Sequence, residues 1–359
     1  MPRATDLGIR IGQLPHGATD SVLDVPGVGL GHCTVWRDEP DPPLGRGVAR
    51  TGVSVLVVAE DAVQRLVPAG GAVLNGFGEC TGFITAAEWG LLRTPVFLTS
   101  TMQLGRVYDA ACELSIERCP QVAEDVIIPM VAECDDSFLS DARRMQVTRA
   151  DVATAWSAAL ASRGASPPPP EGSVGSGTGM SCLGFKGGIG TASRVTPEGH
   201  VVAVLLMTNF GDRARLTVDG VPVGRLLPAA PTRPAPPAGS CIGVVVTDAA
   251  VDGSGCQRLA RRVGLGLART GSVARHGSGE IFLAAATGLR TDPDGRFDGR
   301  AAVSGRDLDP LFEAVVDATE EAVLNSLLAS PTVIGRDGNT SEGLPVDAVA
   351  QLLRAHGRL

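Results

Sequence analysis

The chain has 359 residues, of which 44% are hydrophobic, and its formal net charge is −8 at pH 7. This length and composition indicate a folded globular protein with a sizeable core. The negative charge argues against binding to nucleic acid or to an anionic membrane surface. No apolar run approaches the roughly 18 residues of a membrane-spanning helix.

Near-continuous apolar runs predict buried strands at 53–59, 201–208 and 281–286, and another in the β-branched run that begins at Ile242. Helical spacing of apolar residues predicts helices that include 259–267, 311–327 and 346–355. For the second of these we expect Asp309 as the N-cap and Pro310 as the first helical residue. Strands and helices alternate, which favours one layered α/β or α+β domain over residues 1–359.

Two proline-rich stretches, 166–172 and 227–238, are predicted to be exposed loops within that domain. The second ends at Gly239-Ser240, directly before the buried strand. A serine hydroxyl at such a junction can attack the preceding peptide bond. After cleavage the same serine carries a free α-amine, which is a general base beside the nucleophile. An uncut turn between loop and strand is the simpler interpretation of the junction alone.

Lys186 is the only lysine among the 31 basic residues, and it lies in the glycine-rich segment Gly184–Gly190. A compact ammonium that titrates when buried cannot be replaced by a guanidinium. The position therefore suggests a functional amine or point charge. It is not a P-loop lysine, because Gly187 stands where Ser or Thr would bind magnesium.

Targeting, redox and metal signals are few. No secretory-type apolar segment opens the sequence, so we expect a cytoplasmic protein. The eight cysteines have no CxxC spacing and are expected to be reduced thiols. Five scattered histidines without an HExxH motif give little support for a metal site. We expect neither a metal nor a cofactor.

Several ordered motifs stand out along the chain: Thr19–Val28, Asn75–Gly82, Gly175–Met180 with Phe185–Arg194, Thr208–Gly211, Gly239-Ser240 and His276–Phe282. Together they resemble the DmpA family of self-cleaving L-aminopeptidase/D-esterases, which includes β-peptidyl aminopeptidases and nylon-oligomer hydrolases. The motifs span nearly the whole chain. The resemblance implies a four-layer αββα sandwich with the architecture of N-terminal-nucleophile hydrolases. It also implies self-cleavage into residues 1–239 and 240–359, which stay associated.

The resemblance implies a role for each matching residue. Ser240 would be the nucleophile, and Asn209 would donate to the oxyanion. Ser278 and Glu280 would orient the nucleophile and its amine, and their i, i+2 spacing in extended chain places both on one face. Lys186 would sit beside Ser240 and support charge during cleavage. The expected reaction removes N-terminal residues from small peptides or amino-acid amides, in a homotetramer of cleaved heterodimers.

The segment Val131–Ser137 departs from the family pattern. Glu133 matches the acid that receives the free amine of the substrate. Asp135 stands where the family often has tyrosine, and an ionised carboxylate cannot donate to an oxyanion. We therefore expect Glu133 and Asp135 to contact the substrate, and a carboxylate pair would favour cationic or diamino substrates.

The sequence leaves other functions open. A Ser-His-Asp hydrolase using His276 lacks a GxSxG nucleophile elbow. A self-cleaving acyltransferase resembling the ornithine acetyltransferases would use threonine in a motif that is not seen here. A tailoring amidase acting on a pantetheine-type amide, or a weakly active scaffold, is suggested by Asp135.

Overall fold

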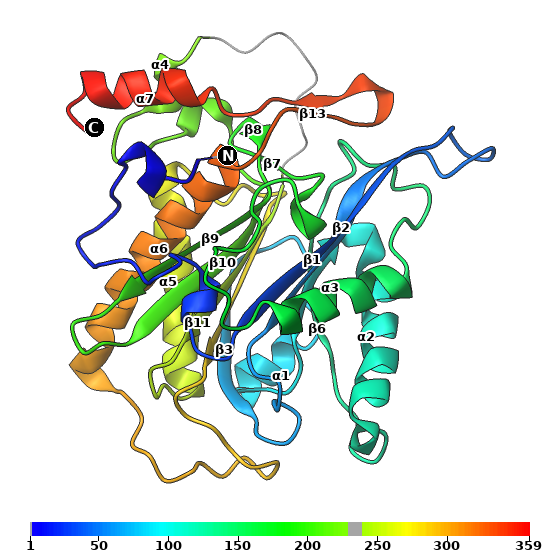
Figure 1. Ribbon diagram of the computed structural model, residues 1–359, viewed down its shortest axis with the longest axis vertical. Coiled ribbons are helices and arrows are strands. Elements are labelled where there is room, and N and C mark those ends of the chain that lie inside the picture. Colours follow the sequence, from blue (N-terminus) through cyan, green and yellow to red (C-terminus); the bar gives the residue numbers. More distant parts are fainter. Residues whose placement is uncertain (1, 229–238) are drawn as a thin grey trace.

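The computed structural model describes residues 2–228 and 239–359. Two sheets are stacked face to face, and a pair of helices covers the outer face of each (Figure 1). The strands of both sheets contribute to one apolar core between them, which contains Leu56 and Leu98 from one sheet and Leu205 and Ile242 from the other. The αββα sandwich expected from the sequence is confirmed.

The smaller sheet has the strand order β1-β2-β5-β6. Its strands are β1 Gly29–Asp38, β2 Val48–Val57, β5 Val96–Ser100 and β6 Met130–Cys134. Helices α2 (Leu104–Arg118) and α3 (Arg149–Ala161) cover its outer face. Because β5 and β6 run parallel, their carboxyl ends lie at the same edge of the sheet.

The larger sheet has the strand order β4-β3-β12-β11-β10-β9. Its strands are β3 Val67–Gly76, β4 Leu91–Leu92, β9 Ile189–Val195, β10 Val201–Thr208, β11 Cys241–Thr247 and β12 Gly279–Ala286. Helices α5 (Gly253–Thr270) and α6 (Asp309–Leu328) cover its outer face. The remaining elements are α1 Phe83–Glu88, α4 Val223–Leu226, α7 Val346–Ala355, β7 Ser181–Cys182, β8 Phe185–Lys186, β13 Val333–Ile334 and β14 Thr340–Ser341.

Strand β10 shows why an unbroken apolar run folds as a central strand here. Successive side chains point to opposite faces of a strand. Val204 and Leu206 therefore pack into the core under the helices, while Leu205 and Met207 pack into the core between the sheets. Both faces are covered, so every position of β10 after Val201 is buried.

The elements expected from sequence are present, with changed limits. The first predicted strand begins earlier and becomes β2, and the predicted helix at 346–355 is α7. The prediction of an Asp309 N-cap is wrong. A 3-10 turn at Gly305–Leu308 runs directly into α6, so Leu308 is the N-cap and Asp309 is already helical. The prolines from 231 to 237 lie outside the described residues.

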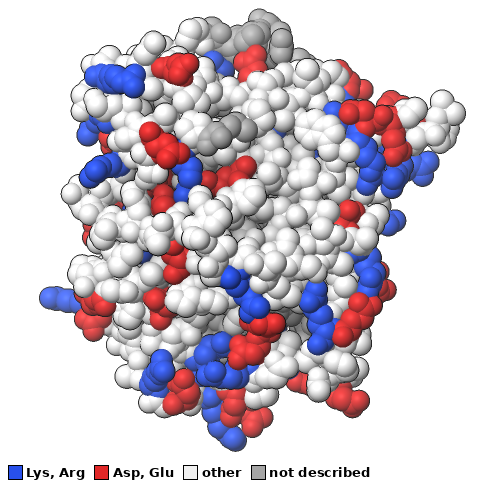
Figure 2. Space-filling model, viewed as in Figure 1, with Lys and Arg blue, Asp and Glu red and all other residues white. Residues whose placement is uncertain are grey.

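Charged side chains of both signs are intermixed on the face that Figure 2 shows, with uncharged surface between them. No helix in residues 2–228 or 239–359 is both long and apolar enough to cross a membrane.

Candidate active site

Three adjacent strands bring the predicted site residues to one edge of the larger sheet. Thr208, the last residue of β10, pairs with Cys241 at the start of β11, and Cys241 pairs with Glu280 near the start of β12. Asn209 and Ser240 flank the first of these pairs along the chain. The register of the sheet therefore places Asn209, Ser240 and Glu280 side by side.

Gly239 is packed tightly against Asn209. A Cβ atom built on Gly239 would lie 1.7 Å from the backbone oxygen of Asn209 and 2.9 Å from its Nδ2. The next residue, Ser240, is buried, and its carbonyl accepts a hydrogen bond of 3.0 Å from the backbone N–H of Asn209. A glycine is needed before Ser240 because any side chain at position 239 would collide with Asn209.

The side-chain amide of Asn209 is held at both ends. Its Nδ2 donates to the backbone oxygen of Asp135 at 2.8 Å, and its Oδ1 accepts from the backbone N–H of Ser181 at 2.8 Å. An amide nitrogen carries two hydrogens, so one remains after the bond to Asp135. This fixed donor lies next to Gly239 and is a candidate for contact with an oxyanion.

Ser278 and Glu280 contact each other at the start of β12. The Ser278 hydroxyl donates a short hydrogen bond to Oε1 of Glu280. Both residues are buried, and burial raises the pKa of Glu280 above its usual value. Oε2 of Glu280 has no hydrogen-bond partner among the described residues, so this oxygen is available to a further donor such as an amine.

The loop before Ser278 is fixed by Asn75 at the end of β3. The Asn75 amide donates to the backbone oxygens of Arg275, His276 and Ser278. A pocket of about 250 Å³ opens beside this loop. It is lined by Phe210, Gly211, Asp212, Gly239, Ser272, Val273, Ala274, Arg275, Ser278 and Glu280. An ion pair between Arg275 and Asp212 forms part of its wall.

Lys186 is fully buried, but its hydrogen bonds do not go to Ser240. Its Nζ donates to the backbone oxygens of Gly177 at 3.0 Å, Met180 at 2.7 Å and Gly187 at 2.6 Å. Burial lowers the pKa of Lys186 to about 7. These three bonds use all the hydrogens of the ammonium, so no direct hydrogen bond to Ser240 is formed, and the expected place of Lys186 beside Ser240 stays a prediction.

Glu133 lies at the carboxyl end of β6, where both of its oxygens are bound. Oε1 accepts from the backbone N–H of Glu79 at 2.9 Å, and Oε2 accepts a short hydrogen bond from the Thr101 hydroxyl. Burial raises the pKa of Glu133. Gly78 lies between the two halves of the site, since a Cβ on it would lie 3.3 Å from Oε1 of Glu133 and 3.5 Å from the Cα of Gly279.

The Asp135 carboxylate is turned into its own loop. It accepts from the backbone N–H of Ser137 at 2.9 Å and from the Ser137 hydroxyl at 2.8 Å. Its backbone oxygen, not its side chain, reaches the site by binding Asn209. Such local side-chain bonds to the residue two positions later are typical of aspartate in turns, which explains how this residue can stand at the tyrosine position of the family.

Sequence reasoning missed four residues of this region: Glu79, Thr101, Asp136 and Ser181. Burial raises the pKa of the fully buried Asp136 to about 7, and the carboxyl group is close enough for its charge to act on Lys186. Glu79 belongs to the motif Asn75–Gly82, which could have drawn attention to it. Asp136 lies in the segment Val131–Ser137 and Ser181 follows the motif Gly175–Met180, so both were adjacent to recognised positions, whereas Thr101 meets the site only through the pairing of distant segments.

A second cluster of ionisable side chains lies where α6 packs against β9. His16, Asp20 and Glu321 have ligand atoms within 4.8 Å of one another, a spacing that could hold a metal ion. However, Arg194 already donates to Oε2 of Glu321 at 2.5 Å and lies 3.6 Å from Asp20. This guanidinium supplies the positive charge that a metal would bring.

Residues 20–341 match the family model of Peptidase family S58. The chain belongs to peptidase family S58. The β-peptidyl aminopeptidase BapA of Sphingosinicella xenopeptidilytica is 36% identical over 373 residues, which cover 99% of this chain and 91% of that relative. The family is therefore shown over almost the entire sequence.

Solved structures give the same assignment. The PH0078 protein of Pyrococcus horikoshii OT3 matches with a TM-score of 0.92 and 37% identity over 100% of both chains. A Burkholderia sp. β-aminopeptidase matches with a TM-score of 0.88 and 38% identity over 99% of both chains. The L-aminopeptidase D-Ala-esterase/amidase of Ochrobactrum anthropi, described as a variant of the Ntn hydrolase fold, has a TM-score of 0.89 and 33% identity over 100% of both chains.

This S58 peptidase is thus a hydrolase of the aminopeptidase and amidase class. The alternatives of a tailoring amidase and of an inactive scaffold are not favoured.

Proposed function

We propose that the chain cuts itself between Gly239 and Ser240, and that Ser240 then serves as an N-terminal nucleophile. The observation that carries this proposal is the packing of Gly239 against Asn209, because it fixes the residue before Ser240 next to a side-chain amide that is itself held in place. The two products are residues 1–239 and 240–359, which remain parts of one domain.

In self-cleavage, Oγ of Ser240 attacks the carbonyl carbon of Gly239. The C–N bond breaks, and the Gly239 acyl group moves to Oγ as an ester while the nitrogen becomes the free α-amine of Ser240. Water then hydrolyses the ester and leaves a carboxylate on Gly239. The second hydrogen of Asn209 Nδ2 stabilises the negative oxygen of the intermediate, a contact worth about 3 kcal/mol in comparable sites.

In substrate turnover the α-amine of Ser240 takes the hydroxyl proton as Oγ attacks the substrate carbonyl, and it returns that proton to the departing amine. Water then releases the acyl group. Oε2 of Glu280, which has no partner within the described residues, would accept from the α-amine and keep it in place. Ser278 fixes the other oxygen of the same carboxylate.

Glu133 is proposed to bind the free amine of the substrate. Two donors already fix its carboxylate, and further lone pairs remain for an ammonium. Substrates are then short peptides and amino-acid amides with a free N-terminus. Because the named relatives include β-peptidyl aminopeptidases, both α- and β-aminoacyl substrates are proposed. The Asp135 carboxylate already accepts two hydrogen bonds from Ser137, and its contact with the substrate stays a prediction.

Intact-mass spectrometry of the purified protein tests self-cleavage. We expect two fragments, the smaller with the N-terminal sequence Ser-Cys-Ile-Gly, and a single uncut and inactive chain for Ser240→Ala. Ser272→Ala, a serine in the wall of the neighbouring pocket, is the matched control and should still be cut. A wild-type chain that stays uncut yet hydrolyses aminoacyl p-nitroanilides would refute the proposal.

Binding of the substrate amine is tested by comparing free and N-acetylated aminoacyl amides. We expect acetylation to lower kcat/KM by roughly 10- to 150-fold, because a charge-assisted hydrogen bond contributes about 1.5–3 kcal/mol. Glu133→Gln should lose most of this preference while self-cleavage continues. Equal rates for the two substrates in the wild type would instead favour an amidase for ligands without an amine.

We also propose a homotetramer of cleaved heterodimers in the cytoplasm. Large apolar side chains on and beside β3 and α1 support association, since Val73, Leu74, Phe77 and Ile84 are all exposed. Light scattering of the cleaved protein would measure its mass directly.

A further inference from the structure

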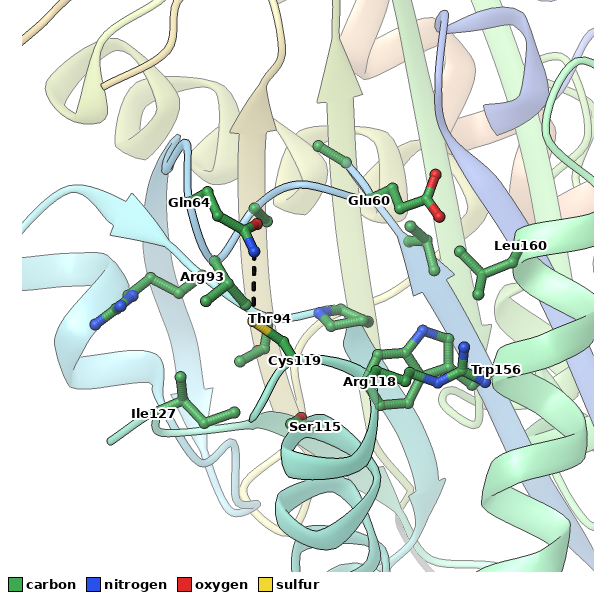
Figure 3. A pocket seen from close by; sticks show the side chains of 15 residues that line it. Glu60, Gln64, Arg93, Thr94, Ser115, Arg118, Cys119, Ile127, Trp156 and Leu160 are labelled. Atoms are coloured by element: carbon green, nitrogen blue, oxygen red, sulfur yellow. Dashed lines mark hydrogen bonds between the residues drawn. The ribbon is translucent and has the colours of Figure 1, made fainter. Parts of the chain in front are cut away.

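A pocket of about 240 Å³ lies at the end of the smaller sheet opposite to Glu133 (Figure 3). It is bounded by the end of β2, the residues just before β5, the last turn of α2 and the side of α3 that faces the sheet. Its lining residues are Val57, Ala59, Glu60, Ala62, Val63, Gln64, Arg93, Thr94, Pro95, Ser115, Arg118, Cys119, Ile127, Trp156 and Leu160. None of these belongs to the proposed catalytic machinery.

The inner wall of this pocket is mainly apolar and is formed by buried and half-buried residues, while Gln64 and Arg118 at its rim are exposed. Trp156 is 7% exposed, and its ring meets the buried Phe97 edge to face, with ring centroids 5.4 Å apart. Val57, Pro95 and Leu160 add aliphatic surface. A wall made of core residues does not need to be ordered by a ligand, which favours binding.

Charge on the pocket is not balanced. Arg93 is paired with Asp125 at 2.7 Å, and Glu60 is paired with Arg163 at 2.5 Å. By contrast, Arg118 has no ion-pair partner in the described part of the chain. Its guanidinium lies 4.7 Å above the Trp156 ring and donates to Oγ of Ser157 at 3.2 Å. The pocket therefore carries one uncompensated positive charge on an aromatic wall.

We propose that this pocket binds a small monocarboxylate with an apolar body. The carboxylate would accept from the planar fork of Arg118, which suits its geometry. Gln64 offers a second donor at the opposite side, where its Nε2 now donates to Sγ of Cys119 at 3.3 Å (Figure 3). A phosphate is a poorer fit, because a single free guanidinium cannot balance two negative charges.

The size of the pocket limits the ligand further. Its volume is below the roughly 300–1,000 Å³ of sites for drug-sized molecules. A benzene ring or short aliphatic chain next to Trp156, with the acid group toward Arg118, fits these limits. 3-Phenylpropionate is therefore the probe, and 3-phenylpropanol is its neutral counterpart.

Isothermal titration of the purified, full-length protein with both probes tests the charge requirement. We expect the acid to bind roughly tenfold or more tightly than the alcohol, and Arg118→Gln to remove this difference. Arg261→Gln, an exposed arginine on α5, is the matched control and should behave as wild type. Peptide hydrolysis should be unchanged in Arg118→Gln, so a failure here is distinct from a failure of the proposed active site.

A second measurement needs no variant. Cys119, the residue that follows α2, lines the pocket, while Cys112 lies within α2 and outside the pocket. Peptide-level mass spectrometry should show that 3-phenylpropionate slows alkylation of Cys119 by iodoacetamide and leaves Cys112 unaffected. No binding of the acid at millimolar concentration, equal binding of acid and alcohol, or equal protection of both cysteines would overturn the proposal.

Discussion

Lys186 and Arg194 are both fully buried at the larger sheet, yet different groups surround their positive charges. Arg194 lies 2.5 Å from Glu321 and 3.6 Å from Asp20, so opposite charges surround it. Lys186 has no carboxylate within 4 Å among the described residues, and backbone oxygens of its own loop bind it instead.

The difference appears in the protonation states. Burial opposes ionisation of Glu321, but the hydrogen bond from His16 and the charge of Arg194 lower its pKa to about 2. Around Lys186 no comparable charge offsets burial, and its pKa falls to about 7. In the paired cluster Glu321 stays ionised over a wide pH range, and its ion pair with Arg194 joins segments distant in sequence. The unpaired lysine titrates near neutrality and fixes the loop that orients Asn209 through Ser181.

Breaking the paired cluster should have the largest effect on stability. Arg194→Met removes the guanidinium that lies 2.5 Å from Glu321 and 3.6 Å from Asp20, which leaves His16 and Arg3 as the ion-pair partners of these carboxyl groups among the described residues. Loss of one partner of a buried ion pair costs about 3–5 kcal/mol. Urea unfolding of the variant should show this loss, while Arg261→Met on the surface of α5 should stay close to wild type. A change below 1 kcal/mol would mean that Arg194 contributes no more than an exposed pair.

Replacing the unpaired lysine should affect catalysis more than folding. Lys186→Arg cannot direct a planar fork at three converging backbone oxygens, so the loop and the Asn209 amide should shift. We expect self-cleavage and kcat to fall by roughly 10²-fold, the effect of losing one oxyanion contributor, with KM nearly unchanged. A variant as active as wild type would show that the single lysine has no role in positioning.

The smallest effect concerns pH. Burial and the charge of Glu321 raise the pKa of Asp20 to about 7 in the folded state, against 3.8 as its ordinary value. The folded state therefore holds a proton that the unfolded state loses, and stability from this group declines as pH rises from about 4 to about 7. Asp20→Asn should remove this part of the decline.

The measurement for Asp20→Asn is the free energy of unfolding at pH 5 and pH 7, taken as a difference from wild type. Each pKa unit corresponds to about 1.4 kcal/mol, so between pH 5 and pH 7 the variant should gain about 2 kcal/mol relative to wild type. Asp136 and Glu171, whose pKa values burial also raises to about 7, contribute equally to both proteins and cancel. A difference independent of pH would contradict the assignment.

The sequence predicted strands where both faces are apolar, as in β10, and it missed strands whose packing depends on glycine. In β3 a Cβ on Gly70 would lie 2.3 Å from the backbone nitrogen of Gln257 in α5. The strand is glycine-rich because a helix lies directly on it, and that contact cannot be seen before the fold is known. The start of α6 could not be predicted either, because it depends on the 3-10 turn at Gly305–Leu308 that precedes Asp309.

For the site, ordered motifs supplied Ser240, Asn209, Ser278, Glu280 and Glu133, and the structure brings the first four to one edge of a sheet. The detailed positions of Lys186 and Asp135 could not be predicted from residue type. Both depend on which backbone oxygens a folded loop presents, namely those that bind the Lys186 ammonium and the one that binds Asn209.

The strand order of the larger sheet has a consequence for the proposed cut. Strands β11 and β12 follow Ser240, while β3 and β10 on either side of them precede Gly239. The two fragments would thus be interlocked within one sheet, and they could not exchange partners without unfolding. Chain ends are usually mobile, but this new end would begin a strand that is paired on both sides. Its amine would be immobilised from the moment it forms, so catalysis would need no further ordering of the base.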